Sequence, residues 1–99
     1  METIYFSNTK ELNHPFLNKN IVFTGALEKM TRVEAAKLAR LVGANIVGYV
    51  NAQTHFLIIG NKKKGISSKE RKARLLEAQG ADIQILNESD FYWLIELHN

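Results

Sequence analysis

Two short runs of this chain, residues 21–23 and 56–59, consist entirely of apolar residues. An apolar run without polar alternation is typical of a strand covered on both faces, as in the centre of a parallel sheet. Two further runs, 45–50 and 82–86, are interrupted by polar or small residues, as edge strands are. Helical patterns separate the first run from the second and the third run from the fourth, and parallel strands need such crossovers. The alternation therefore predicts an α/β fold with a four-stranded parallel sheet.

The expected elements carry clear start and stop signals. The spacings 31–34 and 67–70 both match a capping box, in which a Ser or Thr side chain begins a helix and a Glu three residues later reaches back. Gly43 and Gly80 each follow a helical pattern, at the left-handed position that favours glycine. We expect strands at 21–24, 45–50, 55–59 and 82–86, and helices at 31–42, 67–79 and 88–97.

The composition of each element also predicts its place. The two fully apolar strands belong in the centre, which gives the strand order 2-1-3-4 with right-handed crossovers. The first helix carries a narrow stripe of charge at Glu34, Lys37 and Arg40, so we expect it between the sheet and the last helix. The second helix has fewer apolar positions. We therefore expect two helices on one face of the sheet and the second helix alone on the other.

Length and composition favour one domain. Ninety-nine residues, 45% of them hydrophobic, suffice for a single compact core. Residues 1–18 show no sustained period, so we interpret them as a tail or interdomain linker, with a short strand at residues 4–6. The regular pattern begins afterwards, and we expect the folded domain at 19–97.

Several functional classes are excluded by residue types that are missing. The chain has no cysteine, which rules out disulfides and thiolate metal sites, and its three histidines lie far apart in sequence. It shows no apolar run of about 20 residues, no signal-peptide pattern, no catalytic triad motif and no P-loop. We expect a cytoplasmic domain that is not itself an enzyme, with no cofactor, metal or membrane association.

Basic side chains concentrate in one segment, residues 62–74. The net charge is only +3, but this segment holds seven of the thirteen Lys and Arg residues. Such a cluster attracts polyanions such as DNA. A solvated loop and helix face is the alternative, and it is the one that charge alone favours. The seven residues are Lys62, Lys63, Lys64, Lys69, Arg71, Lys72 and Arg74.

The end of the first strand offers a second anion-binding feature. Thr24 supplies a hydroxyl and Gly25 a backbone N–H that a ligand can approach closely. With a lysine from the second helix, this corner has the donors that a phosphate dianion requires. The alternative is that both residues merely end the strand.

From Asn18 to Leu97 the chain resembles the BRCT domain family, in the order strand–helix–strand–strand–helix–strand–helix. Within this family it resembles bacterial members, which end NAD-dependent DNA ligases or follow the exonuclease of epsilon-type DNA polymerase III proteins. The serine–lysine stretch at 67–69 and the segments 76–80 and 87–91 look most like the exonuclease-linked type. The resemblance rests on residues 21–25, 31–35, 42–44, 54–60, 68–69 and 85–91.

The resemblance implies a site and a function. Phosphate-binding BRCT domains use a Ser or Thr hydroxyl, the next N–H and a lysine on the second helix, which here correspond to Thr24, Gly25 and Lys72, with Lys69 as the second choice. Trp93 departs from the family's usual aromatic position, which Phe91 occupies, and we favour helix packing for it over exposure. Backbone contacts to DNA would come from Arg32, Lys62, Lys63, Lys64 and Lys69.

We therefore expect a non-catalytic DNA-binding module of a replication or repair protein that recognises a 5′-phosphorylated end or a strand break. The alternative is a protein-interaction module, with or without a phosphorylated ligand. Such a module would tether a parent DNA polymerase III epsilon-type exonuclease or DNA ligase to a replication partner.

Overall fold

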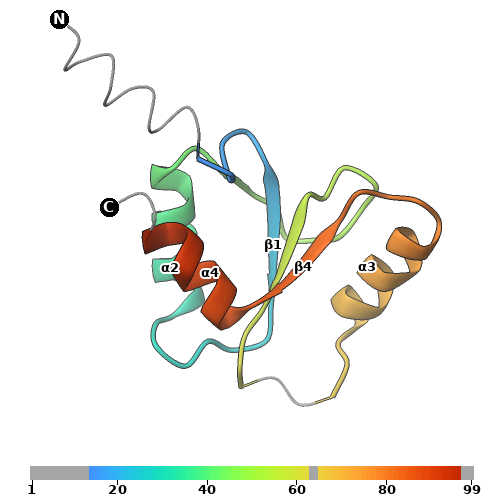
Figure 1. Cartoon of the computed structure of the whole chain (residues 1–99). Helices are drawn as coiled ribbons and strands as arrows, with labels where there is room; N and C mark the ends of the chain where they lie inside the picture. The colour runs from blue at the N-terminus through green and yellow to red at the C-terminus, as the bar shows by residue number, and fades with distance from the viewer. Residues whose placement is uncertain (1–13, 63–64, 97–99) are drawn as a thin grey trace, which may run out of the picture.

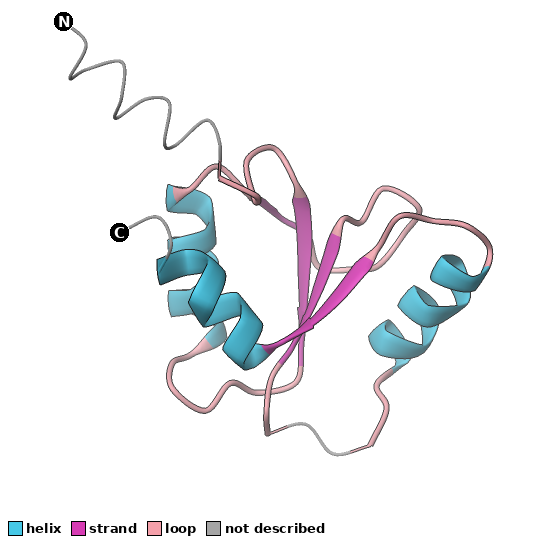
Figure 2. Cartoon of the chain, in the orientation of Figure 1, coloured by secondary structure: helices cyan, strands magenta, loops and turns pink. Residues whose placement is uncertain are grey.

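The chain folds into a sheet flanked by helices, as a computed structural model describes for residues 14–62 and 65–96 (Figure 1). Strands and helices alternate along the chain, and each crossover passes through a helix except that between the second and third strands (Figure 2). The elements are β1 (Asn20–Thr24), α2 (Arg32–Leu41), β2 (Asn45–Ile46), β3 (Phe56–Ile59), α3 (Ser68–Ala78), β4 (Gln84–Asn87) and α4 (Glu88–Glu96).

The sheet has four parallel strands in the order β2-β1-β3-β4, which confirms the predicted topology. Helices α2 and α4 cover one face, and α3 lies alone on the opposite face, also as expected (Figure 1). At the carboxyl ends of the two central strands, Thr24 pairs in register with Ile59. The residues that follow β1 and β3 therefore start from neighbouring points at one edge of the sheet.

Most differences from the expected elements lie at their ends. Thr31 and Ser67 precede their helices as N-caps, each accepting a hydrogen bond from the backbone N–H three residues later. The expected strand at 45–50 is much shorter, because its ladder to β1 ends with the Val47 N–H donating to the Ile21 carbonyl oxygen (2.9 Å). Beyond this point the chain turns, residues 48 and 49 are exposed, and Val50 is buried again.

Phe16 shows that the packed domain begins before residue 19, where the sequence placed its start. Its side chain is completely buried, and its ring lies 5.0 Å from that of Phe56 and 6.0 Å from that of Phe91. His14 is buried as well, and its Nδ1 accepts a hydrogen bond from the Phe16 N–H (3.0 Å). His14 and Phe16 are thus part of the domain core, whereas the strand expected at 4–6 lies outside the described residues.

Alanines make the closest contact between α2 and the rest of the core. Ala35, Ala36 and Ala39 are buried, whereas Val33 and Leu41 are 70% and 75% exposed. Small side chains let α2 lie close to the sheet, so its larger apolar residues at the flanks do not reach the interior. Val33 and Leu41 therefore remain exposed, although the helix was expected to lie between the sheet and the last helix.

The last helix uses a single aromatic residue as its main anchor. Phe91 is fully buried and packs edge-on against Phe23 at 5.3 Å. Trp93 is 62% exposed, because its position on α4 faces away from the sheet. The preference for packing of Trp93 was therefore wrong.

Candidate functional site

The carboxyl ends of β1 and β3 lie side by side at one edge of the sheet. The chain leaves β1 toward α2 on one face and leaves β3 toward α3 on the opposite face (Figure 1). In open α/β sheets, ligands bind at such a switch point, where the two connections diverge. Both helices also begin at this edge, so their positive dipole ends favour an anion there.

Thr24 connects the end of β1 to the start of α3. Its side chain is 4% exposed, and its hydroxyl donates to the Ser67 Oγ at 2.8 Å. Ser67 in turn accepts from the Glu70 N–H at 3.1 Å as the N-cap of α3. The next residue, Gly25, has a φ of 78°, which lets the backbone turn sharply behind the hydroxyl.

Lys69 lies against the same strand end. Its ammonium donates to the Phe23 carbonyl oxygen at 3.1 Å, and its side chain is only half-exposed. Burial, together with the positive charge of Arg32, lowers the pKa of Lys69 below its ordinary value. Two cations from different helices thus face each other at the carboxyl end of β1.

A small pocket of about 150 Å³ opens beside these two cations. Its volume suits a compact group such as a phosphate rather than a drug-sized ligand, for which pockets of roughly 300 Å³ or more are usual. None of the described residues that line it is acidic. The lining consists of Phe23, Arg32, Ala36, Ile46, Val47, Gly48 and Lys69.

Of the predicted site residues, Arg32 and Lys69 are the ones found among the described residues that line this pocket, and Thr24 and Gly25 are not. Lys72 is exposed on α3, one turn beyond Lys69. Lys62 is exposed in the loop after β3, where its N–H donates to the Ala26 carbonyl oxygen at 3.0 Å. Lys63 and Lys64 lie outside the described residues. The residues brought together at the strand end are therefore Thr24, Ser67, Lys69 and Arg32.

Ser67 was not among the residues singled out for binding, although the sequence held a signal for it. It was expected only to cap the second helix, and it does so. A residue that caps the helix following a central strand also lies at the carboxyl edge of the sheet, where ligands bind.

The loops after β1 and β3 run together beyond the pocket. The Gly60 N–H donates to the Thr24 carbonyl oxygen at 2.9 Å, which extends the strand pairing past the sheet. A Cβ on Gly60 would lie 2.3 Å from the carbonyl oxygen of Ala26. Glycine is therefore required where the two loops approach each other.

A buried carboxylate, which the sequence analysis did not single out, holds both loops. Glu88, the first residue of α4, is completely buried. Its oxygens accept hydrogen bonds from the N–H groups of Glu28 (2.8 Å), Lys29 (3.2 Å) and Asn61 (2.9 Å), and from the Tyr92 hydroxyl. One side chain thus joins the loop after β1, the loop after β3 and α4.

These contacts determine the protonation states of Glu88 and Tyr92. Burial acts to raise the pKa of Glu88, but the hydrogen bonds from Asn61, Tyr92, Glu28 and Lys29 outweigh it and hold that pKa below its ordinary value. Burial and the neighbouring Glu88 carboxylate raise the pKa of Tyr92 to about 12. Glu88 is therefore ionised at neutral pH and Tyr92 is neutral.

Two further features of the described residues bear on function. Across residues 14–62 and 65–96, no group of three or more His, Cys, Asp or Glu side chains is placed to hold a metal ion. Within the same ranges, no helix is long and apolar enough to cross a membrane.

Comparison with known proteins identifies relatives for most of the chain. A DNA ligase of Roseobacter denitrificans is 43% identical over 82 residues, which cover 83% of this chain and 10% of the ligase. A DNA ligase of Xanthobacter autotrophicus is 38% identical over 81 residues, with coverage of 82% and 10%. A DNA ligase of Citrifermentans bemidjiense is 34% identical over 87 residues, with coverage of 88% and 12%. The chain spans about a tenth of the length of these curated relatives.

A family model agrees with the fold. The model described as the BRCA1 C Terminus (BRCT) domain matches residues 11–95, a range that includes the buried Phe16 and every described strand and helix except the last residue of α4. The parallel sheet in the order β2-β1-β3-β4, with two helices on one face and one on the other, is consistent with this family. The chain therefore belongs to the BRCT family.

Proposed function

We propose that this domain binds DNA through a terminal 5′-phosphate, held at the carboxyl end of β1. The observation that carries the proposal is that Lys69 and Arg32 lie together at a small pocket. None of the described residues that line this pocket is acidic. Two cations that repel each other are stabilised by an anion placed between them. A phosphate dianion supplies that charge in a compact group.

Polar donors at the same corner would complete the site. Among the hydrogen bonds of the described residues, Ser67 accepts from Thr24 and from Glu70, so its own hydroxyl proton can be donated to a phosphate oxygen. Gly25 contributes its N–H from a conformation in which no side chain blocks the backbone. In this proposal the Thr24 hydroxyl orients the Ser67 hydroxyl, or it rotates and donates to the phosphate itself.

Lys69 is a better candidate than Lys72 for the phosphate ligand. It is half-buried and touches the strand end, whereas Lys72 is exposed one turn away. In the proposal, Lys72 and Lys62 contact phosphates further along the DNA backbone, together with Lys63 and Lys64. Contacts of this kind add affinity without sequence preference and make binding sensitive to salt.

The proposed setting is DNA replication or repair, in a non-catalytic module of a larger bacterial protein of the cytoplasm. The relatives that carry the name DNA ligase favour a ligase as the parent enzyme over an epsilon-type exonuclease of DNA polymerase III. A role in tethering the parent enzyme to a replication protein is the alternative function. It predicts binding that does not depend on a DNA 5′-phosphate.

Fluorescence anisotropy with two otherwise identical duplexes, one with a 5′-phosphate and one with a 5′-hydroxyl, tests the proposal. We expect tighter binding to the phosphorylated duplex, with a preference of tenfold or more that persists when salt is raised. Equal affinity for both duplexes would reduce the site to a generic basic face. No binding to either duplex would contradict DNA binding and favour the tethering role.

A further inference from the structure

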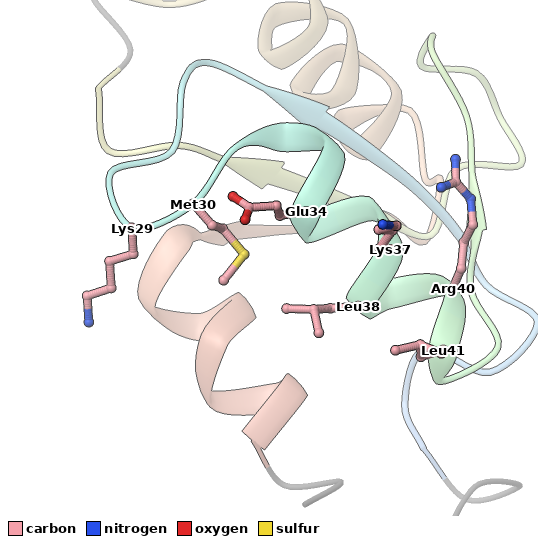
Figure 3. Close-up of a pocket in the computed structure, with 7 residues that line it drawn as sticks. All are labelled: Lys29, Met30, Glu34, Lys37, Leu38, Arg40 and Leu41. Atoms are coloured by element: carbon pink, nitrogen blue, oxygen red, sulfur yellow. The ribbon is translucent and has the colours of Figure 1, made fainter.

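An apolar groove runs between α2 and α4, away from the pocket beside Lys69. Its larger part has a volume of about 800 Å³ and an apolar floor formed by Met30, Leu38 and Leu41. Figure 3 shows Met30 and Leu38 directed into the space between the two helices, with Leu41 further along α2. A second hollow of about 270 Å³ shares Met30 and Leu38 and adds Tyr92 and Ile95 of α4. The groove therefore extends across both helices.

This floor is apolar surface that the fold leaves uncovered. Leu41 is 75% exposed, and Met30 and Leu38 are half-buried at the edge of the core. Apolar side chains that line a hollow and are bordered by charge are characteristic of a surface that binds another protein. The spacing of Leu38 and Leu41 along α2 would match one side of a helix laid in the groove.

The charges around the floor are mainly positive. Lys29, Lys37 and Arg40 line the larger part, against the single carboxylate of Glu34. That carboxylate accepts hydrogen bonds from the Thr31 N–H (2.8 Å) and hydroxyl (3.1 Å), and these bonds lower the pKa of Glu34. It is therefore committed to capping α2. Glu96 borders only the smaller hollow, so the cations remain in excess.

We propose that this groove binds an acidic amphipathic segment of a partner protein, with its apolar side chains on Met30, Leu38 and Leu41 and its carboxylates facing Lys29 and Lys37. A second copy of this chain fits less well, because a two-fold interface would set one cation-bordered groove against another. DNA also fits less well, since its phosphates would gain nothing from the apolar floor.

The groove and the phosphate pocket have no lining residue in common. They lie on different sides of α2, so both can be occupied at once. The inference goes beyond the proposed DNA function, and neither depends on the other. A domain with both sites could hold a DNA end and a partner protein together.

Titration of the ¹⁵N-labelled domain with a designed peptide, followed by amide chemical shifts, tests the inference. The probe is an amidated helical peptide of roughly 15 residues, long enough to populate a helix, with Leu at i, i+3, i+4 and i+7 and Glu at the flanking positions. We expect saturable shifts around Met30, Leu38 and Leu41, and no displacement of the peptide by a 5′-phosphorylated duplex. A control peptide with Lys in place of each Glu should bind at least tenfold more weakly.

Matched variants locate the binding surface. Leu41→Glu should weaken peptide binding at least tenfold, and Lys37→Glu should weaken it severalfold. Leu75→Glu changes a leucine of similar exposure (58%) on α3, on the opposite face of the sheet, and should leave binding within twofold.

Three outcomes would overturn the inference. The first is the absence of saturable shifts in the groove, and the second is equal binding of the two peptides. The third is a dimer, detected by sedimentation, that Leu41→Glu dissociates, because the groove would then bind a second copy.

Discussion

The ammonium of Lys69 donates a hydrogen bond to the carbonyl oxygen of Phe23 at 3.1 Å, so the first turn of α3 lies against the end of β1. This contact brings a cation from one face of the sheet to the corner where α2 begins on the other face. Arg32, in the first turn of α2, is close enough to lower the pKa of Lys69. The proposed anion site depends on this arrangement, and it separates the role of Lys69 from that of Lys72.

Replacing each lysine by alanine should therefore have unequal effects on DNA binding. Lys69→Ala should lower affinity for a 5′-phosphorylated duplex by roughly 10- to 100-fold, since a hydrogen bond to a charged group contributes about 1.5–3 kcal/mol. Lys72→Ala should lower affinity for phosphorylated and unphosphorylated duplexes alike, by a few-fold. Anisotropy titrations measure both, with Arg71→Ala as an exposed control on the same helix. A larger loss of phosphate preference in Lys72→Ala would reverse the assignment.

The hydroxyl of Thr24 should matter for both stability and binding. Thr24→Val removes the donor to Ser67 while keeping the shape of the side chain. We expect a loss of about 1 kcal/mol in the free energy of unfolding and a loss of the preference for a 5′-phosphate. Thr24→Ser keeps the hydroxyl and should retain most of the preference. If Thr24→Val bound both duplexes like the parent protein, the hydroxyl pair would have no role in recognition.

Glu88→Gln should destabilise the domain strongly at neutral pH. The amide would face the backbone N–H groups of Glu28, Lys29 and Asn61 with fewer acceptors, and we expect a loss of at least about 2 kcal/mol. Glu77→Gln, at an exposed position on α3, is the matched control and should change stability by less than about 0.5 kcal/mol. Urea unfolding measures both variants.

The same carboxylate predicts a pH dependence. Because folding lowers the pKa of Glu88, its stabilisation is fully present above the ordinary value of 4.5 and is lost as the pH falls through the lower pKa of the folded state. The difference between the parent protein and Glu88→Gln should therefore narrow when unfolding is measured at about pH 3. A difference that stayed constant between neutral and acidic pH would show that charge is not what the loops recognise.

Gly60 should tolerate no side chain. In Gly60→Ala the new Cβ would meet the backbone of Ala26 at 2.3 Å, and backbone in a paired loop cannot move aside cheaply. We expect a loss of about 1–3 kcal/mol in thermal or urea unfolding. Gly48→Ala is the control, since a Cβ there has no neighbour within 4 Å and the position lacks a positive φ. Similar stabilities of the two variants would contradict the close approach of the loops.

Phe16 should contribute more to the stability of the domain than Trp93, which is the reverse of what their sequence contexts indicate. Phe16→Ala empties a fully buried position in the aromatic cluster and should cost about 3–5 kcal/mol. Trp93→Ala removes a side chain that is 62% exposed and should change stability by about 0.5 kcal/mol or less. Equal losses from the two variants would show that the core does not extend to Phe16.

The central part of the fold could be predicted because local pattern and tertiary role agree there. The apolar runs at 21–23 and 56–59 became the central strands, and the caps at Thr31 and Ser67 begin the helices. Phe16 could not be assigned in this way. It sits in a polar stretch without a period, and only contacts with Phe56 and Phe91, distant in sequence, place it in the core.

The sequence predicted the region of the candidate site better than it predicted the individual residues. Lys69 and Lys72 share a helix face, and only the distance to β1 distinguishes them. A geometric signal was present, since the first turn of α3 lies nearer to the strand ends than the second. Glu88 carried no such signal, because an acid at the start of a helix is usually a solvated cap. Its burial depends on loops that converge from two other parts of the chain.

The most direct test of the phosphate site is an amide chemical-shift comparison on the ¹⁵N-labelled domain, with the same duplex carrying a 5′-phosphate or a 5′-hydroxyl. We predict that only the phosphorylated duplex shifts the amides of Gly25, Ser67 and Lys69, and that Lys69→Ala abolishes these shifts while the fold persists. The contradicting result would be the same shifts with both duplexes, confined to the exposed lysines of the 62–74 segment. The strand-end corner would then not recognise the phosphate.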